Sequence, residues 1–106
     1  MLLSNLEVVP GHKIEQHLGL VHGSAVRAKH VGRDFMAGLK NIVGGELKAY
    51  TELLQESRSQ ATERMVAEAQ ALNANAVINI RLATSAITAG AAEVFVYGTA
   101  VVISKE

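Results

Sequence analysis

A long amphipathic pattern in the middle of the chain constrains the fold most strongly. It follows the adjacent glycines Gly44 and Gly45, runs from about Glu46 to Leu72, and ends at residues 73–75 before a β-branched segment. At about 100° per residue, one face carries an apolar stripe, which is typical of a helix that covers a sheet. The stripe consists of Leu47, Tyr50, Leu54, Ala61, Met65 and Leu72.

A second stripe of mostly small residues lies about 120° or more around the same helix. Its members are Ala49, Leu53, Ala67 and Ala71. A helix that covers one sheet needs only one stripe. The second stripe therefore predicts close approach of another backbone, such as that of a second subunit.

The segments around this helix predict one antiparallel sheet. Strands are expected at residues 17–28, 76–82 and 94–103, with a short one at 6–9, and a shorter helix is expected at 29–43. Asparagine tolerates left-handed backbone, so residues 73–75 are predicted to form the exit turn, and residues 83–93 a mobile loop. The predicted fold is α+β: about three main antiparallel strands packed in two layers against one long and one short helix, in a single domain of residues 1–106.

The last predicted strand, VFVYGTAVVI, is apolar on both faces. An antiparallel strand with one solvated face should alternate between apolar and polar residues. Hydrophobic residues make up 49% of this 106-residue chain, which has little of its own left to cover a second face. The pattern therefore predicts self-assembly.

Composition excludes several classes of function. Ten basic residues balance ten acidic ones, which does not favour a duplex nucleic acid or an anionic membrane as partner. Cysteine is absent, which excludes disulfides, thiolate catalysis and thiolate metal sites. No apolar run approaches the ~20 residues that span a bilayer, and the N-terminus lacks a signal-peptide pattern. We expect a cytoplasmic protein with no nucleic-acid or membrane partner.

A set of short motifs spread over nearly the whole chain resembles the YbjQ-like family. The motifs are Arg33-Asp34, Ile42-Val43-Gly44-Gly45-Glu46, Tyr50, Arg58, Ala61, Ala69, Asn75-Ala76-Val77 and Tyr97-Gly98-Thr99-Ala100-Val101. The resemblance implies a small bacterial or archaeal α+β subunit, assembled as a homopentamer, of a family described as "putative heavy-metal-binding" and without an assigned role. At Asn73 the family commonly carries glycine.

The family description makes the four histidines, His12, His17, His22 and His30, the candidate metal ligands. They match no compact ligand motif, and soft metals prefer the thiolates that this chain lacks. In an extended segment His22 and His30 would lie about 26 Å apart at ~3.3 Å per residue, too far for one ion. We therefore expect no metal site within one subunit. The alternative is a site that gathers one histidine from each subunit around a symmetry axis.

Two further pairs are candidate ligand or interface residues. Arg33 with Asp34 is placed to hold an anion at the start of a short helix, although Asp34 as a helix-start residue and Arg33 as a partner of Glu46 is the simpler interpretation. Gly44 and Gly45 precede a helix, as in phosphate-binding loops, but no Gly-Lys-Ser/Thr follows. These glycines are expected instead to let two helices meet at a sharp angle.

Four more residues complete the candidate set. Tyr50 and Arg58 lie two helical turns apart and could line a pocket between subunits; a core tyrosine and a surface arginine are the alternative. Strict alternation places Asn79 and Arg81 on the same face as Val77, which predicts interface hydrogen bonds or a wet central channel.

Nothing in the sequence indicates catalysis or a cofactor. No Gly-x-Ser-x-Gly turn is present, and Glu63 and Glu68 of the long helix are spaced so that they do not face each other as an acid–base pair would. We expect a non-enzymatic homo-oligomer, a pentamer from the resemblance, that acts as an assembly or small-ligand-binding module. The alternative is a metal-binding protein that uses interface histidines, and a third is an interface-built hydrolase or isomerase.

Overall fold

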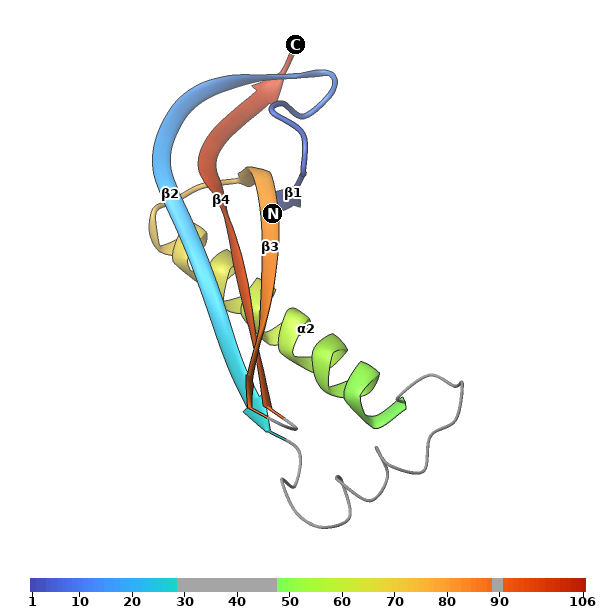
Figure 1. Cartoon of the computed structure of the whole chain (residues 1–106). Helices are drawn as coiled ribbons and strands as arrows, with labels where there is room; N and C mark the ends of the chain where they lie inside the picture. Colours follow the sequence, from blue (N-terminus) through green and yellow to red (C-terminus); the bar gives the residue numbers. More distant parts are fainter. Residues whose placement is uncertain (29–47, 89–90) are drawn as a thin grey trace.

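A single helix packs on one face of a four-stranded mixed sheet in the computed structural model, which describes residues 1–28, 48–88 and 91–106 (Figure 1). The elements are β1 (Leu2–Leu3), β2 (His12–Ala28), α2 (Lys48–Ala71), β3 (Ala76–Thr88) and β4 (Ala91–Lys105). The strand order is β1-β3-β4-β2. β1 pairs with β3 in parallel, and the other two pairings are antiparallel.

The predicted α+β class and two-layer arrangement are confirmed, with three differences in detail. The sheet is mixed because β1 runs parallel to β3. The short first strand lies at residues 2–3, so the strand predicted at residues 6–9 is wrong, and β2 begins earlier than predicted, at His12. The short helix predicted at residues 29–43 lies outside the described residues.

Most of the segment predicted as a loop at residues 83–93 is strand. β3 continues to Thr88 and β4 begins at Ala91, with Ala83 opposite Phe95 and Ala86 opposite Ala92. Alanine, serine and threonine in this segment gave no strong local signal. Strand preference depends on the cross-strand neighbours, which β4 supplies here, so tertiary pairing determines the structure.

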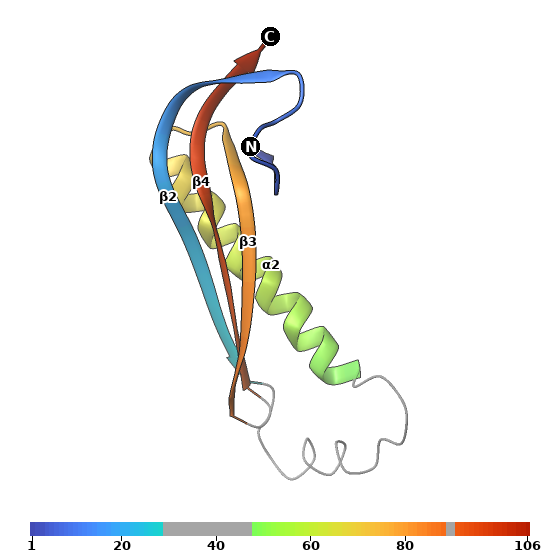
Figure 2. The same cartoon turned by 45° about the horizontal axis from the view of Figure 1, so that its top comes forward.

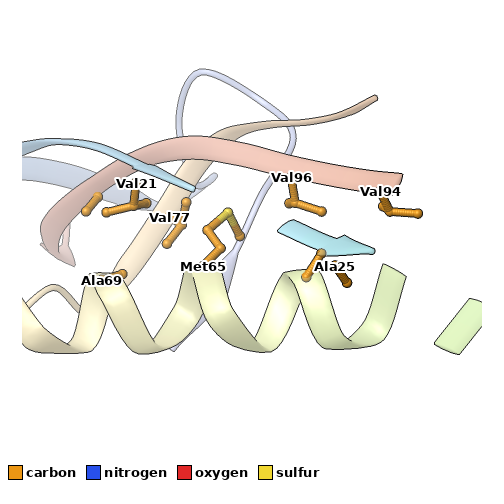
Figure 3. Close-up of a cluster of buried hydrophobic side chains, with 9 residues drawn as sticks. Val21, Ala25, Met65, Ala69, Val77, Val94 and Val96 are labelled. Carbon is orange, nitrogen blue, oxygen red and sulfur yellow. The ribbon is translucent and has the colours of Figure 1, made fainter. Parts of the chain in front are cut away.

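The buried face of α2 follows a four-residue spacing. Leu53, Ser57, Ala61, Met65 and Ala69 are all buried, and Met65 lies among valines of the sheet (Figure 3). Steps of four residues rotate this row by about 40° each, so the core contact winds around the helix.

The predicted stripes therefore fit only in part. Ala61 and Met65 of the first stripe are buried, whereas Leu72 is 41% exposed. Leu53 of the second stripe lies in the core, while Ala67 and Ala71 are exposed. Side-chain size favoured the wrong rows in the sequence, because the helix approaches β2 so closely that small residues make the contact.

The close approach occurs at Gly23 of β2. A Cβ added there would collide with the backbone oxygen of Ala61 and lie 2.6 Å from the backbone nitrogen of Met65. Both atoms belong to the helix backbone and cannot move aside as a flexible side chain would. Gly23 thus sets the distance between the two layers.

Candidate functional site

The sheet face opposite α2 carries exposed polar and aromatic side chains, among them the predicted site residue Arg81. Val21, Gly23 and Ala25 of β2 are buried under the helix, so the alternate residues point to the other side. We call this side the open face. Its central members, from β2, β4 and β3, are Leu20, His22, Ser24, Val26, Phe95, Tyr97, Thr99, Arg81 and Ala83.

Register across the three strands places His22, Tyr97 and Arg81 in one transverse row. Ring centroids lie 5.7 Å apart for His22 and Phe95, and 5.6 Å apart for Phe95 and Tyr97. These separations are typical of contacting aromatic pairs. Leu20 is 68% and Val26 59% exposed on the same face. The row thus combines imidazole, phenol and guanidinium groups with an apolar surround.

A bulge at Asn79 places Arg81 in this row. Asn79 has a φ of 53°, and the register passes from Ile78 opposite Thr99 to Arg81 opposite Tyr97, so β3 contains one extra residue. The extra residue reverses the alternation. Val77 is buried beneath α2, whereas Arg81 lies on the open face, so the prediction that Arg81 shares the face of Val77 is wrong.

Arg81 is held by its own subunit. Its Nη1 donates to the carbonyl oxygens of Asn5 at 2.8 Å and Ile80 at 2.9 Å. The backbone N–H of Asn79 donates to the carbonyl of Leu6 at 2.9 Å. Both predicted residues therefore attach the N-terminal segment to β3, and the side chain of Arg81 is exposed beside Tyr97.

The N-terminal segment also covers part of the face that the sequence left without cover. Val9 packs against Ala76, Ile78, Val101 and Ile103, which form a second small core. The chain itself therefore shields the end of β4 near Ile103. Among the described residues, the half of the open face around Phe95 and Tyr97 does not share this cover.

The histidines do not meet in the subunit. A register shift in β2 between His17 and Gly19 brings His17 and His22 onto the same face, opposite Val101 and Tyr97. Four residues of β4 separate these positions, or about 13 Å at ~3.3 Å per residue. The ring of His12 instead contacts the carbonyl oxygen of Pro10 at 3.0 Å, and His30 lies outside the described residues.

The described residues contain no group of three His, Cys, Asp or Glu side chains that could hold a metal ion. The chain has no cysteine to supply a thiolate. The donor set of the described residues therefore does not fit a heavy-metal centre.

The other predicted residues are not brought together. Arg33, Asp34, Gly44 and Gly45 lie outside the described residues. Tyr50 lies in the first turn of α2, but its side chain is outside the described part. Arg58 is exposed, and its carbonyl accepts from Thr62 Oγ1 at 2.8 Å.

Polar contacts between α2 and β2 were missed by the sequence analysis. Arg27 Nη1 lies 2.8 Å from Glu56 Oε2, and its Nε donates to Gln60 Oε1 at 3.1 Å. A shallow pocket of about 400 Å³ adjoins these contacts and is lined by Arg27, Gln55, Glu56, Ser59, Gln60 and Glu63. Glu56, Gln60 and Glu63 have the three- and four-residue spacing of one helix face, which was the available signal.

A second polar connection runs along the outer edge of β2. Arg64 Nη1 donates to the carbonyl oxygen of Ser24 at 2.6 Å, and the N–H of His22 donates to Glu68 Oε1 at 3.3 Å. No sequence signal links these residues, because they are 40 and 46 positions apart.

Comparison with known proteins assigns the family. The family model named YbjQ and described as "Putative heavy-metal-binding" matches residues 1–104. The chain belongs to the YbjQ family. Its relatives in this family include a UPF0145 protein of Hahella chejuensis, 64% identical over 103 residues that cover 97% of this chain and 99% of the relative. A UPF0145 protein of Thermus thermophilus is 55% identical over 101 residues, covering 95% and 89% of the two chains.

A solved structure shares the fold of this YbjQ-family chain. The crystal structure of a protein of unknown function from Pediococcus pentosaceus, of the DUF74 family, superimposes with a TM-score of 0.66 and covers 98% of each chain. At 16% identity, the likeness concerns the fold alone. Among the described residues, no helix combines the length and apolarity needed to cross a membrane.

Proposed function

We propose that this YbjQ-family protein is a non-enzymatic homo-oligomer, pentameric as the family resemblance implies, whose subunit interfaces hold a small ligand. One observation carries the proposal: on the open face, the exposed Leu20 and Val26 of β2 flank the contacting rings of His22, Phe95 and Tyr97. Contiguous apolar surface of this kind marks an interaction site more often than free surface.

The shape of the subunit supports the same proposal. Its principal extents are 55 × 26 × 16 Å and its radius of gyration is 17.3 Å, whereas a compact chain of this length has about 13 Å. Among the described residues, α2 covers one face of the sheet, and the N-terminal segment covers only the end of the other face near Ile103. A neighbouring copy on the open face would supply the missing layer.

The ligand of this assembly would contact the row of His22, Tyr97 and Arg81. These side chains offer hydrogen-bond donors and acceptors next to an aromatic surface, as small-molecule sites commonly do. The row itself contains no serine, threonine or cysteine nucleophile, which favours binding over catalysis. A cytoplasmic location remains a prediction.

The assembly is tested by light scattering with mass determination. We expect the wild-type chain to have a mass that is a multiple of 11.3 kDa at micromolar concentration, and a fivefold multiple for a pentamer. The variant Leu20→Glu should dissociate it, because a carboxylate would be buried without a partner. Leu72→Glu is the matched control at an exposed leucine of the helix end and should leave the mass unchanged. A monomeric wild-type protein would refute the proposal.

A metal-binding role through interface histidines is the second candidate. His17 and His22 both lie exposed on the open face, which is the face that we propose to be shared between copies. Imidazole suits zinc, copper and nickel, and a ring of copies would bring equivalent histidines together around its axis.

Calorimetric titration with zinc, copper and nickel tests this alternative. We expect less than one ion per chain, with binding lost in His17→Ala or His22→Ala and retained in His12→Ala. The dissociated Leu20→Glu variant should also lose binding, because the ligands come from several copies. Absence of binding by the wild-type protein would remove the metal role and leave the assembly untouched.

A further inference from the structure

We infer that the outer edge of β3, from Leu82 to Ala86, is the surface through which a second copy of this chain adds a strand to the sheet. The inference rests on the proposed assembly and names the part of the subunit that pairs. It is argued from the backbone and from the contrast between the two edges of the sheet.

The pairing register determines which backbone groups of β3 point outward. His22 lies opposite Tyr97, but its N–H donates to Glu68 and therefore not to β4. Hydrogen-bonded and non-hydrogen-bonded pairs alternate in antiparallel sheets, so Tyr97 directs its backbone groups to Arg81 on the other side. Along β3, the residues that direct their N–H and C=O away from the sheet are then Leu82, Thr84 and Ala86.

An independent contact gives the same orientation. The carbonyl of Val77 accepts from the N–H of Ser4 at 2.9 Å, so Val77 also directs its backbone outward. Val77 lies opposite Ala100, and Leu82 lies opposite Val96. Ala100 and Val96 are four residues apart on β4, so their backbone groups point in the same direction, and the groups of Leu82 point outward like those of Val77. The bulge at Asn79 preserves this relation.

The two edges of the sheet are treated differently. On β2, Glu68 accepts from His22 and Arg64 donates to Ser24, so two outward backbone groups in the middle of that edge have partners from α2. The edge of β3 has partners only as far as Ile80. These partners are the strand β1 and the carbonyl groups of Ser4 and Leu6. Beyond Ile80, no described residue hydrogen-bonds to the outward groups of Leu82, Thr84 or Ala86. Figures 1 and 2 show β1 beside only the upper part of β3.

Between its two irregularities, the β3 edge lacks the features that prevent strand addition. Free edges are commonly blocked by a charged side chain, a proline or a bulge. The segment 82–86 carries no charge and no proline, and the register shifts of β3 lie on either side of it, at 78–81 and 86–88. Leu82 is 49% exposed. An unprotected edge of this length in a native chain is best explained by pairing in the assembled protein.

A second copy is the partner that suits this edge. The segment carries no charge and the chain has no formal net charge, so copies do not repel one another as they approach. Recognition of a foreign peptide usually adds side-chain pockets to the backbone hydrogen bonds, and the shallow pocket around Arg27 is lined by no residue of β3. Pairing at β3 therefore depends on the backbone, which every copy supplies.

Amide hydrogen exchange on the full-length wild-type chain, followed residue by residue beside its mass, tests the inference. We expect the amides of Leu82, Thr84 and Ala86 to exchange as slowly as those of Ala83 and Ser85, which face β4, and roughly a hundredfold slower than in an unpaired edge. A multimer in which these three amides exchange fast while their neighbours are slow would overturn the inference and leave the assembly standing. A monomer would overturn both.

A proline variant supplies the second arm. The N–H of Thr84 points outward, so Thr84→Pro removes it without removing a hydrogen bond to β4. Proline is tolerated on an edge strand when its nitrogen faces outward, so the subunit should still fold. We expect it to reduce the mass to that of one chain while circular dichroism stays native, whereas Thr84→Ala, which keeps the backbone N–H, should retain the wild-type mass. A folded Thr84→Pro variant with wild-type mass would refute strand addition.

Discussion

Replacement of Gly23 by alanine is expected to lower the free energy of unfolding by about 1–3 kcal/mol or more. The new Cβ would collide with the backbone of Ala61 and lie 2.6 Å from the backbone nitrogen of Met65. Relief requires α2 to move away from β2, which opens space around the buried Met65. Urea denaturation followed by circular dichroism measures the effect.

The neighbouring variant Ser24→Ala is the matched control. Its side chain lies on the opposite face of β2, away from the helix, so the substitution should change the stability by no more than about 0.5 kcal/mol. If Gly23→Ala proved as stable as Ser24→Ala, the close packing of α2 on β2 would be wrong.

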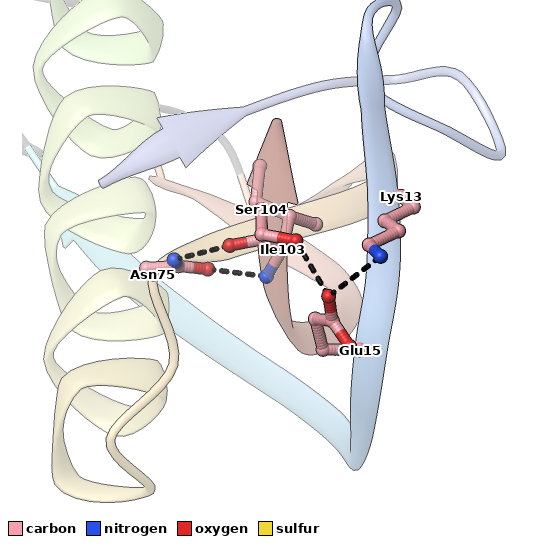
Figure 4. Close-up of polar contacts among 5 residues, drawn as sticks. All are labelled: Lys13, Glu15, Asn75, Ile103 and Ser104. Atoms are coloured by element: carbon pink, nitrogen blue, oxygen red, sulfur yellow. Dashed lines mark hydrogen bonds and ion pairs between the residues drawn. The ribbon is translucent and has the colours of Figure 1, made fainter. Parts of the chain in front are cut away.

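Replacement of Asn75 by alanine is expected to cost about 1–3 kcal/mol. The side-chain amide of Asn75 donates to the carbonyl of Ile103 at 2.8 Å and accepts from the N–H of Ile103 at 2.7 Å (Figure 4). It thereby takes the place of a strand neighbour just before β3 begins at Ala76. Loss of this side chain leaves both backbone groups of Ile103 without their partner.

Thermal denaturation compares this variant with one at a nearby exposed polar contact. Ser104 donates to Glu15 Oε1 at 2.6 Å, and Lys13 lies 3.5 Å from the same oxygen. Because these side chains are exposed, Ser104→Ala should lower the melting temperature much less than Asn75→Ala. Equal shifts would show that the Asn75 contact contributes no more than a surface interaction.

Local pattern predicted the main helix, the strand after it and the turn between them. The apolar spacing located α2, and the β-branched residues after it located β3. The exit turn is confirmed at Asn73, whose φ is 64°, since asparagine tolerates this left-handed conformation. Ala61 and Met65 were correctly assigned to the core.

The parts that depend on register were not predictable from the sequence. The bulge at Asn79 moves Arg81 to the opposite face, and alternation alone contains no sign of it. The shift in β2 between His17 and Gly19 brings His17 and His22 to one face, although one position is odd and the other even. Tertiary pairing decides both cases, so the candidate site emerged only when the three strands were aligned.

Contacts between segments far apart in the chain were also not predictable from the sequence. The sequence analysis left Val101 and Ile103 without cover from their own chain. In the structure Val9 of the N-terminal segment packs against residues of β3 and β4 at this place. The sequence analysis gave no role to Arg64 or Glu68, yet each contacts the backbone of β2. Sequence spacing carries no information about contacts across such separations.

The contacts of Arg64 and Glu68 link the integrity of the helix to solubility. As long as α2 is folded, it keeps the middle of the β2 rim from acting as a template for further strands. When α2 melts, the carbonyl of Ser24 and the N–H of His22 lose their partners together, and a bare strand flanked by Leu20 and Val26 is left. Loss of helix on heating should therefore coincide with the onset of fibrillar precipitation.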